Sequence, residues 1–452
     1  MFRIISISII WLRRLDWEIK MIFLLFIILL PILFRIVLHK YDPVGYFSWV
    51  RSLVINGDLN VTDTFTHFDF GGRFLIKGKT GTPGQPWAVG CAILWLPAFL
   101  IAHLGVLIAN ALGESVAANG YSLPYIGAVS LATVLYGLGG LMIMYKLIKN
   151  YYGEQIAGLS VTAIWLASPL VFYMYSHPMM SHANDMFAYT LLLWAWQYAR
   201  QSQKGWPPYV LLGAAAGLSA LIRNQNAALV LLIVAFIMID TIRKQWTWQQ
   251  SLAAIAIFSL VWWIAFFPQL YVWHATIGVW FPGNPSSMVG GGDFYWGVPW
   301  IFDVMFSSNR GLFIWNPILL FAVMGWIFLF KKDPALTIFL VASFCIQLGV
   351  IGSWNHWHGD NAFGQRFFVN LTPAFMFGFA ALVNELRGRV SPKTLGAMCS
   401  IFILWNFLLI VQYAMQTIPR GGPVSLSVLA RNQFLIIPRN LSRIIGAWIR
   451  KS

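Results

Sequence analysis

Apolar stretches of membrane-spanning length recur along almost the whole chain, and they constrain its fold more than any other feature. Runs such as residues 21–38, 121–145 and 251–272 are close to the roughly 20 apolar residues that a helix needs to cross a bilayer. Only 10% of the residues are charged, against roughly 25% in soluble domains. Alternation over about ten residues, the mark of a transmembrane β-barrel, is missing. The sequence therefore predicts an all-α polytopic membrane protein.

Basic clusters between the apolar runs predict which loops face the cytoplasm. The net charge of +15 comes from 30 Lys and Arg against 15 Asp and Glu. Most of these basic residues lie in short loops, as the positive-inside rule describes, so the charge does not indicate a nucleic-acid partner. The expected cytoplasmic loops are residues 146–151, 200–204, 243–244, 331–332 and 387–393. The N-terminal segment before residue 21, also basic, is expected to be cytoplasmic and to lead into an uncleaved first helix.

One apolar stretch, residues 87–112, conflicts with this topology. If this stretch and residues 121–145 both crossed the membrane, Lys146 and every later basic cluster would lie outside. We therefore expect residues 87–112, which contain Pro97, to form a re-entrant or interfacial helix on the outer side. The alternative, full crossing, would leave Asp42 and Arg366 on opposite sides. If residues 87–112 do not cross, the chain crosses the membrane about eleven times, and the basic tail, residues 418–452, lies outside.

The chain reads as one membrane domain, residues 1–452, with no visible internal repeat. The first outer loop covers residues 40–120 and includes the interfacial helix, and a second large outer loop covers residues 273–310. Shorter polar stretches at 173–185, 223–226 and 353–366 are expected on the same side. The three cysteines, Cys91, Cys345 and Cys399, have no metal-ligand spacing.

Polar residues that begin helices on this outer side are the candidates for chemistry. Asp42, at the outer end of the first helix, is a candidate general base or an interfacial Asp that ends a helix. His177, His182 and Asp185 fit a metal site, a proton relay or hydrogen bonding to sugar, whereas a simple helix cap is the structural alternative. Arg223 is expected to reach a wet cavity or an anion, or to extend to the interface.

The densest polar block is residues 352–368. Aromatic rings stack on sugars, amides and carboxylates bind hydroxyl groups, and Arg binds phosphate through two N–H groups. An aromatic interface belt explains the Trp residues of the block but not its charged members. Arg310 also stands at a helix start, so two arginines on one face could hold a phosphate. The block supplies Trp354, His356, His358, Asp360, Gln365 and Arg366.

The order of these motifs resembles the bacterial branch of the GT-C superfamily, membrane glycosyltransferases that use polyprenyl-phosphate sugars, including protein mannosyltransferase-like and aminoarabinose transferase-like enzymes. The resemblance runs from Asp42 to Pro373. Its motifs are a first-loop acidic residue, a Pro-containing outer segment, a Tyr/Ser/His-rich turn, an Arg-Gly-Leu-Phe-x-x-x-Pro element and a Gly-x-Arg-Phe element. They match Asp42, residues 84–87, residues 175–178, residues 310–317 and residues 364–367.

The resemblance implies a GT-C-type helical bundle, a polyprenyl-phosphate-linked donor and an Asp base at the acceptor. Asp42 is then the catalytic residue, Arg366, Arg310 and Arg223 hold the donor phosphate, and His177, His182, Asp185, Trp354, His356, His358, Asp360 and Gln365 position the sugar or the acceptor. Many relatives carry two adjacent acidic residues in the first loop, whereas Pro43 follows Asp42. A metal-free mechanism is therefore expected, no metal ligand or cofactor is predicted, and a divalent metal stays an alternative.

The sequence thus predicts inverting transfer of one sugar to an acceptor hydroxyl on a glycan, lipid or protein. The expected location is the inner membrane of a prokaryote, with the active site facing the periplasm or exterior and in contact with membrane lipids. Two other functions remain open, a lipid or glycan transporter and an O-antigen ligase or polymerase. A transporter predicts repeated halves, and a ligase predicts a long outer loop with paired arginines, which residues 273–310 supply only weakly.

Overall fold

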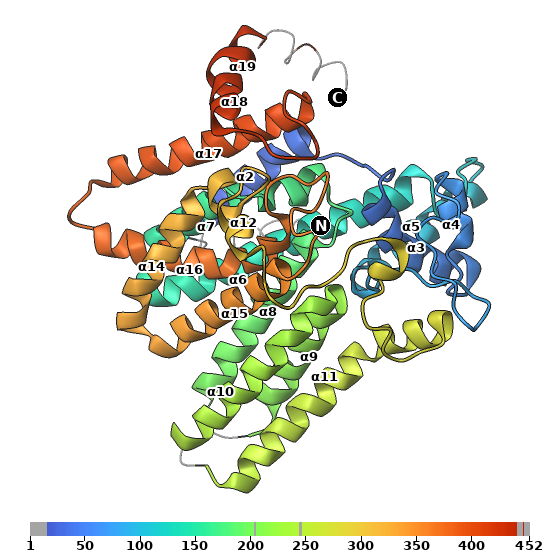
Figure 1. Cartoon of the computed structure of the whole chain (residues 1–452), viewed down its shortest axis with the longest axis horizontal. Helices are drawn as coiled ribbons and strands as arrows, with labels where there is room; N and C mark the ends of the chain where they lie inside the picture. The colour runs from blue at the N-terminus through green and yellow to red at the C-terminus, as the bar shows by residue number, and fades with distance from the viewer. Residues whose placement is uncertain (1–15, 203–204, 244–245, 441–445, 447–452) are drawn as a thin grey trace, which may run out of the picture.

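The computed structural model describes residues 16–202, 205–243, 246–440 and 446 and is almost entirely helical (Figure 1). Within this described part of the chain, β-structure is limited to isolated bridges such as Ile76 with Gly84. The predicted all-α class is confirmed. The basic residues before Asp16, Lys204, Lys244 and the end of the basic tail lie outside the described residues.

Each of the eleven segments that were expected to cross the membrane contains a helix. Among the described residues, six helices are long and apolar enough to cross a membrane, namely α5, α6, α11, α15, the helix over Arg366–Leu386 and α17. The number of crossings therefore stays a prediction. The helices of the eleven segments are α2 (Trp17–Leu33), α6 (Leu123–Tyr152), α7 (Glu154–Leu166), α8 (His182–Gln201), α9 (Pro207–Ile222), α10 (Leu229–Arg243), α11 (Trp248–Ile277), α14 (Ile318–Lys332), α15 (Pro334–Gly352), α16 (Thr372–Leu386) and α17 (Pro392–Ala414).

Further helices connect these eleven on the side where the candidate residues lie. The apolar run 311–330 is not one helix, because the ring of Pro317 excludes Asn316 from the helical region. Asn316 has φ −130° and ψ 76°, so the run divides into α13 and α14. The connecting elements are α3 (Tyr41–Arg51), α4 (Thr62–His67), α5 (Gly90–Ala111), α12 (Ile301–Phe306), α13 (Leu312–Trp315), and the C-terminal α18 (Leu426–Arg431) and α19 (Ile437–Arg439).

Several of the predicted cytoplasmic loops meet at one end of the bundle, which we call the cationic end and define by Lys149, Arg200, Lys332 and Asp333. The Arg200 guanidinium donates to Asp333 Oδ1 at 2.7 Å, and Lys332 donates to the carbonyl of Tyr151. Lys149 pairs with Asp16 at 2.6 Å and with Glu154 at 2.7 Å. Loops 146–151, 200–204 and 331–332 thus share one end, as the positive-inside pattern predicts.

The helix α5 packs beside the part of α6 that is remote from the cationic end. The indole N–H of Trp95 donates to Thr133 Oγ1 at 2.8 Å, and His103 Nδ1 lies 2.7 Å from the Tyr125 hydroxyl. Along α5 the contacts therefore run toward the start of α6, while the cationic end lies at its other terminus, Tyr152. Figure 1 shows α3, α4 and α5 together on the right, with α14 and α16 on the left. The interfacial placement of α5 stays a prediction.

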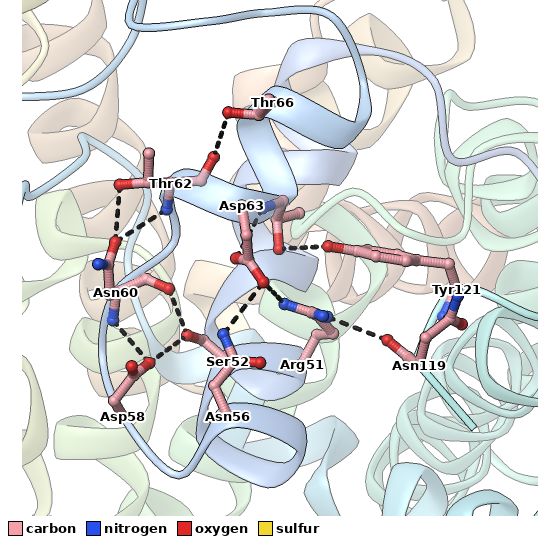
Figure 2. Close-up of polar contacts among 11 residues, drawn as sticks. Arg51, Ser52, Asn56, Asp58, Asn60, Thr62, Asp63, Thr66, Asn119 and Tyr121 are labelled. Atoms are coloured by element: carbon pink, nitrogen blue, oxygen red, sulfur yellow. Dashed lines mark hydrogen bonds and ion pairs between the residues drawn. The ribbon is translucent and has the colours of Figure 1, made fainter. Parts of the chain in front are cut away.

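A polar network fixes α3 to the segment that follows α5 (Figure 2). Arg51 pairs with Asp63 and donates through Nε to the carbonyl of Asn119 at 3.1 Å. Its guanidinium lies 4.5 Å from the centre of the Tyr121 ring, and His67 stacks on the same ring at 3.9 Å. Cation–π and stacking contacts of this kind stabilise an exposed loop even where it buries little apolar surface. The first outer loop is therefore a folded unit that carries α3.

Glycine pairs set the distance between central helices. A Cβ added to Gly325 in α14 would lie 1.8 Å from the carbonyl oxygen of Gly378 in α16. Small residues allow helix backbones to approach closely where van der Waals packing, rather than the hydrophobic effect, drives helix association. The α14–α16 contact therefore depends on the absence of side chains at both positions.

We expect Gly325→Ala to separate α14 from α16 and to lower the thermal unfolding midpoint in detergent, at a cost of about 2 kcal/mol. Gly396→Ala in α17 is the control, because an added Cβ there meets nothing within 4 Å. Equal midpoints for the two variants would contradict the packing argument.

We expect Asp333→Ala to destabilise the fold by about 3 kcal/mol, because it leaves the Arg200 charge without its partner. Burial raises the pKa of Asp333, but hydrogen bonds from Arg200, the Leu336 amide and Tyr151 lower it to about 2. This stabilisation is thus present above the ordinary Asp pKa and lost as the pH falls from ~4 toward 2. The measurement is thermal unfolding against pH. Glu385→Ala, which removes the more exposed Glu385–Arg389 pair, is expected to change the midpoint little.

Candidate functional site

An ion pair between Asp42 and Arg366 forms the centre of the candidate site. Asp42 lies in the first turn of α3, and Arg366 begins a short 3-10 helix that leads into α16. Arg366 Nη1 donates to Asp42 Oδ2 at 2.6 Å, although the two residues are 324 positions apart in the chain. The side chains are 29% and 15% exposed. The structure thus brings together the predicted base and a predicted phosphate ligand.

This contact requires both residues to emerge on one side of the membrane. Between them lie α6 to α11, α14 and α15, and these eight helices return the chain to its starting side if each of them crosses. A crossing by α5 as well would separate Asp42 from Arg366. The ion pair therefore agrees with the placement of α5 along the outer part of α6.

Trp87 holds the other oxygen of the Asp42 carboxylate. Its indole N–H donates to Asp42 Oδ1 at 2.8 Å. The ring fits against α3 only because residue 45 is glycine, since a Cβ there would lie 2.2 Å from the indole. Gln85 donates to the carbonyl of Gly45 at 2.9 Å and to Ser48 Oγ at 2.8 Å. The Pro-containing segment of the first loop thus packs against α3 and orients the Asp42 carboxylate.

The charges around Asp42 keep it ionised. Burial alone would raise the pKa of Asp42, but the Arg366 charge, hydrogen bonds from Trp87 and Arg366, and the Arg223 charge bring it below its ordinary value. Lys40 stands two residues before Asp42, and its pKa is lowered by burial and by Arg420 and Arg366. The carboxylate therefore lies in a positive environment that suits an anionic ligand.

His177 lies against Lys40, with Lys40 Nζ 3.0 Å from His177 Nε2. Burial and the charges of Lys40, His39 and Arg420 lower the pKa of His177 to about 3, so the ring is neutral. An ammonium group only donates hydrogen bonds, so Nε2 accepts and Nδ1 carries the proton. Within the described residues, this Nδ1 is buried without a partner.

A second buried cluster joins Arg223 to the first turn of α8. Arg223 Nη1 lies 3.1 Å from His182 Nδ1, and Arg223 Nε lies 3.6 Å from Asp185 Oδ2. Asn226 donates to Asp185 Oδ1 at 2.6 Å. Because Arg223 only donates, His182 Nδ1 accepts and the proton sits on Nε2, which has no partner among the described residues. Arg223 also lies 5.1 Å from the centre of the Phe367 ring, next to Arg366.

The block at residues 352–360 forms a rim beside Arg366. Gly359 approaches it so closely that a Cβ would lie 2.8 Å from Arg366 Nε. His356 Nδ1 lies 3.4 Å from the Asp360 carboxylate, and His358 Nδ1 accepts from the backbone N–H of Asp360 at 3.1 Å. Asp360, 61% exposed, has φ +52°, a left-handed conformation that is uncommon outside glycine. This rim faces solvent and can receive an acceptor.

Two residues that were predicted to bind sugar, Trp354 and Gln365, form hydrogen bonds within the protein. Trp354 donates to the carbonyl of Gly291 at 3.2 Å and so ties the second outer loop to the rim. Gln365 is 1% exposed and donates to the carbonyl of Trp357 at 3.2 Å. Their contacts are structural, and a role in sugar binding remains a prediction.

Arg310 was expected to bind phosphate, but its side chain binds only groups of the protein among the described residues. The residue is 0% exposed, and its five N–H groups are all taken. Nε donates to the Ala362 carbonyl at 2.9 Å, while the Nη atoms donate to Asn309 Oδ1 and to the carbonyls of Pro419, Arg420 and Gly422. No N–H is left for a phosphate, because a guanidinium has only five donors. Arg310 is therefore a clamp that joins the rim to the chain after α17.

We expect Arg310→Lys to destabilise the protein by about 3 kcal/mol, because an ammonium cannot reach five acceptors and leaves buried carbonyls unpaired. The measurement is the thermal unfolding midpoint together with the rate of proteolysis after α17. Arg73→Lys is the matched control, since Arg73 is exposed and donates only to the Tyr41 hydroxyl. A stable Arg310→Lys variant that binds lipid phosphate poorly would restore the phosphate role.

Lys40 and Trp87 are the site residues that the sequence analysis did not select. Both had a visible signal, because Lys40 adjoins the Asp42 motif and Trp87 ends the Pro-containing element. Among the described residues, no group of three or more His, Cys, Asp or Glu side chains is placed to hold a metal ion.

Comparisons with known proteins agree with this architecture. Residues 125–263 match the family described as dolichyl-phosphate-mannose-protein mannosyltransferase, a segment that contains His177, His182, Asp185 and Arg223. The crystal structure of ArnT from Cupriavidus metallidurans in the apo state aligns with a TM-score of 0.51 and 13% identity, covering 96% of this chain and 74% of that chain. The same protein bound to undecaprenyl phosphate gives a TM-score of 0.48, 14% identity and the same coverage. No curated protein gives a significant match. At 13% identity the likeness to the apo structure shows a common fold.

Proposed function

We propose that the chain is a GT-C-type membrane glycosyltransferase, which transfers one sugar from a polyprenyl phosphate to an acceptor hydroxyl at the outer face of the plasma membrane; the family match over residues 125–263 and the ArnT-like fold support this. The observation that carries this proposal is the ion pair between Asp42 and Arg366, a base beside a cation at the end of the bundle opposite the cationic end. The description of the matched family, which names dolichyl-phosphate-mannose, supports a lipid-phosphate donor.

In this proposal Asp42 accepts the proton of the acceptor hydroxyl. The hydroxyl oxygen attacks the anomeric carbon from the face opposite the phosphate, so the configuration inverts. The bond between the anomeric carbon and the phosphate oxygen breaks, and its electron pair stays on that oxygen. The leaving lipid phosphate is a stable anion and needs no general acid. Trp87 orients the base through its 2.8 Å hydrogen bond.

The donor phosphate is held by cations around Asp42. Arg366 and Arg223 keep this role from the sequence analysis, and Lys40 takes the place of Arg310. Such groups, fixed in a partly dry cavity, stabilise charge that develops on the leaving group. His177 and His182 offer N–H donors to sugar or phosphate oxygens, and the rim of His356, His358 and Asp360 receives the acceptor.

We expect Asp42→Asn to reduce sugar transfer by at least about 1000-fold, because the base is lost. Purified protein in nanodiscs, incubated with radiolabelled polyprenyl-phosphate sugars and membrane lipid acceptors, provides the measurement. Asp69→Asn is the control, because Asp69 is exposed in the same outer loop and Asn tolerates its φ of +59°.

A folded Asp42→Asn variant that transfers sugar at the wild-type rate would rule out the base assignment. Movement of the labelled lipid across the bilayer without transfer would indicate a transporter, and transfer of a preassembled glycan in place of a single sugar would indicate a ligase.

A further inference from the structure

Both oxygens of the proposed base already accept a hydrogen bond from the protein. Asp42 Oδ2 accepts from Arg366 at 2.6 Å, and Oδ1 accepts from the Trp87 indole at 2.8 Å. An ion-paired carboxylate accepts a proton poorly, since protonation abolishes the pair. The acceptor hydroxyl therefore meets an effective base only after the hold of Arg366 on Asp42 is relaxed.

Arg366 is well placed to release Asp42, because its donors are not exhausted. Within the described residues its Nε is buried without a hydrogen-bond partner, and Gly359 is the residue packed against it. The guanidinium lies 5.0 Å from the centre of the Phe367 ring, a contact that does not use its N–H donors. This is the opposite of Arg310, whose five donors are all engaged. A buried unused donor indicates a ligand that supplies an acceptor.

We propose that Arg366 is the shared counter-ion of Asp42 and of the donor phosphate, and that it passes from the first to the second during transfer. The inference rests on the proposed function and concerns the order of events in the same site. A planar guanidinium offers two N–H edges, so one edge can keep Asp42 while the other engages the phosphate. As the reaction proceeds, the contact with Asp42 weakens and the contact with the phosphate strengthens.

The summed charge of Asp42 and the donor phosphate stays the same during this exchange. Before transfer, Asp42 and the phosphodiester of the donor each carry one negative charge. The hydroxyl proton moves to Asp42, the hydroxyl oxygen binds the anomeric carbon, and the departing phosphate monoester keeps the bonding electrons. Asp42 is then neutral and the phosphate carries two charges. The total is unchanged, so a single cation between the two groups is stabilising throughout.

The exchange also explains why donor and acceptor must act together. Without donor, Arg366 holds Asp42 in its ionised, weakly basic state, so an acceptor alone is not activated. A bound phosphate competes for the guanidinium and makes Asp42 more basic. The other charged and titratable groups that act on Asp42 are Lys40, Tyr46 and Arg223, and the test has to separate Arg366 from them.

The test is the affinity of full-length variants in nanodiscs for a radiolabelled polyprenyl monophosphate. We expect Asp42→Asn to bind it about tenfold more tightly than wild type, since Arg366 no longer has a competing anion, and Arg366→Gln to bind it at least about tenfold more weakly. In the double variant the gain from Asp42→Asn should disappear, because the residue that transmits it is missing. Asp69→Asn should bind like wild type.

Equal or weaker binding by Asp42→Asn would overturn the proposal, and so would a gain that persists in the Arg366→Gln background, which would indicate a general charge effect through Lys40 or Arg223. If Asp42→Asn does not fold, Asp42→Ser supplies the same loss of charge, and the wild-type melting profile in detergent is the criterion of folding. Failure of the proposed function is distinguishable, because it would appear as sugar transfer by Asp42→Asn, whatever the affinity.

Discussion

A charge that is buried among the helices of this protein needs a partner, because the bilayer around the helices offers no water to solvate it. At the cationic end Arg200 is paired with Asp333, and at the opposite end Arg366 is paired with Asp42. Each pair joins segments that are more than a hundred residues apart. An unpaired partner would cost several kcal/mol, so these pairs decide which helix ends meet. The bundle and the candidate site therefore depend on the same physical requirement.

The two ends use pairing in different ways. Around Asp333 the available oxygens are consumed by Arg200, Tyr151 and the first turn of α15, and the result is a closed structural joint. Around Asp42 the cations outnumber the carboxylates among the described residues, since Lys40, Arg223 and Arg366 all act on Asp42, while Asp185 pairs with Arg223. An anionic ligand would neutralise this positive excess. This difference in charge balance separates a site from a structural joint.

Periodic apolar runs predicted the helices well, because membrane thickness sets their length and the positive-inside bias sets their direction. The topology placed Asp42 and Arg366 on the same side of the membrane once residues 87–112 were kept on one side, but it did not predict that they pair. Contacts within irregular segments were not predictable. The helix-start position of Arg310 looked the same as that of Arg366, yet the chain after α17 folds back and occupies all its donors. Trp87 was not selected from the sequence because its position depends on close contact between its ring and Gly45. Only the folded structure shows this contact.

The buried hydrogen-bond donors of the site that have no partner indicate the composition of its ligand. His177 Nδ1, His182 Nε2 and Arg366 Nε are all buried without partners among the described residues, and the two histidines owe their N–H orientation to a cation on the opposite ring nitrogen. Lys40 and Arg223 therefore act twice, through their charge and by fixing the tautomer that presents a donor. Three buried donors without acceptors destabilise the free protein by a few kcal/mol, and a ligand rich in oxygen atoms would remove that cost on binding. A sugar phosphate has this composition, whereas an apolar lipid tail alone does not. The polar groups of this site thus favour the head of a lipid-linked sugar, and the apolar helices around them accommodate its chain.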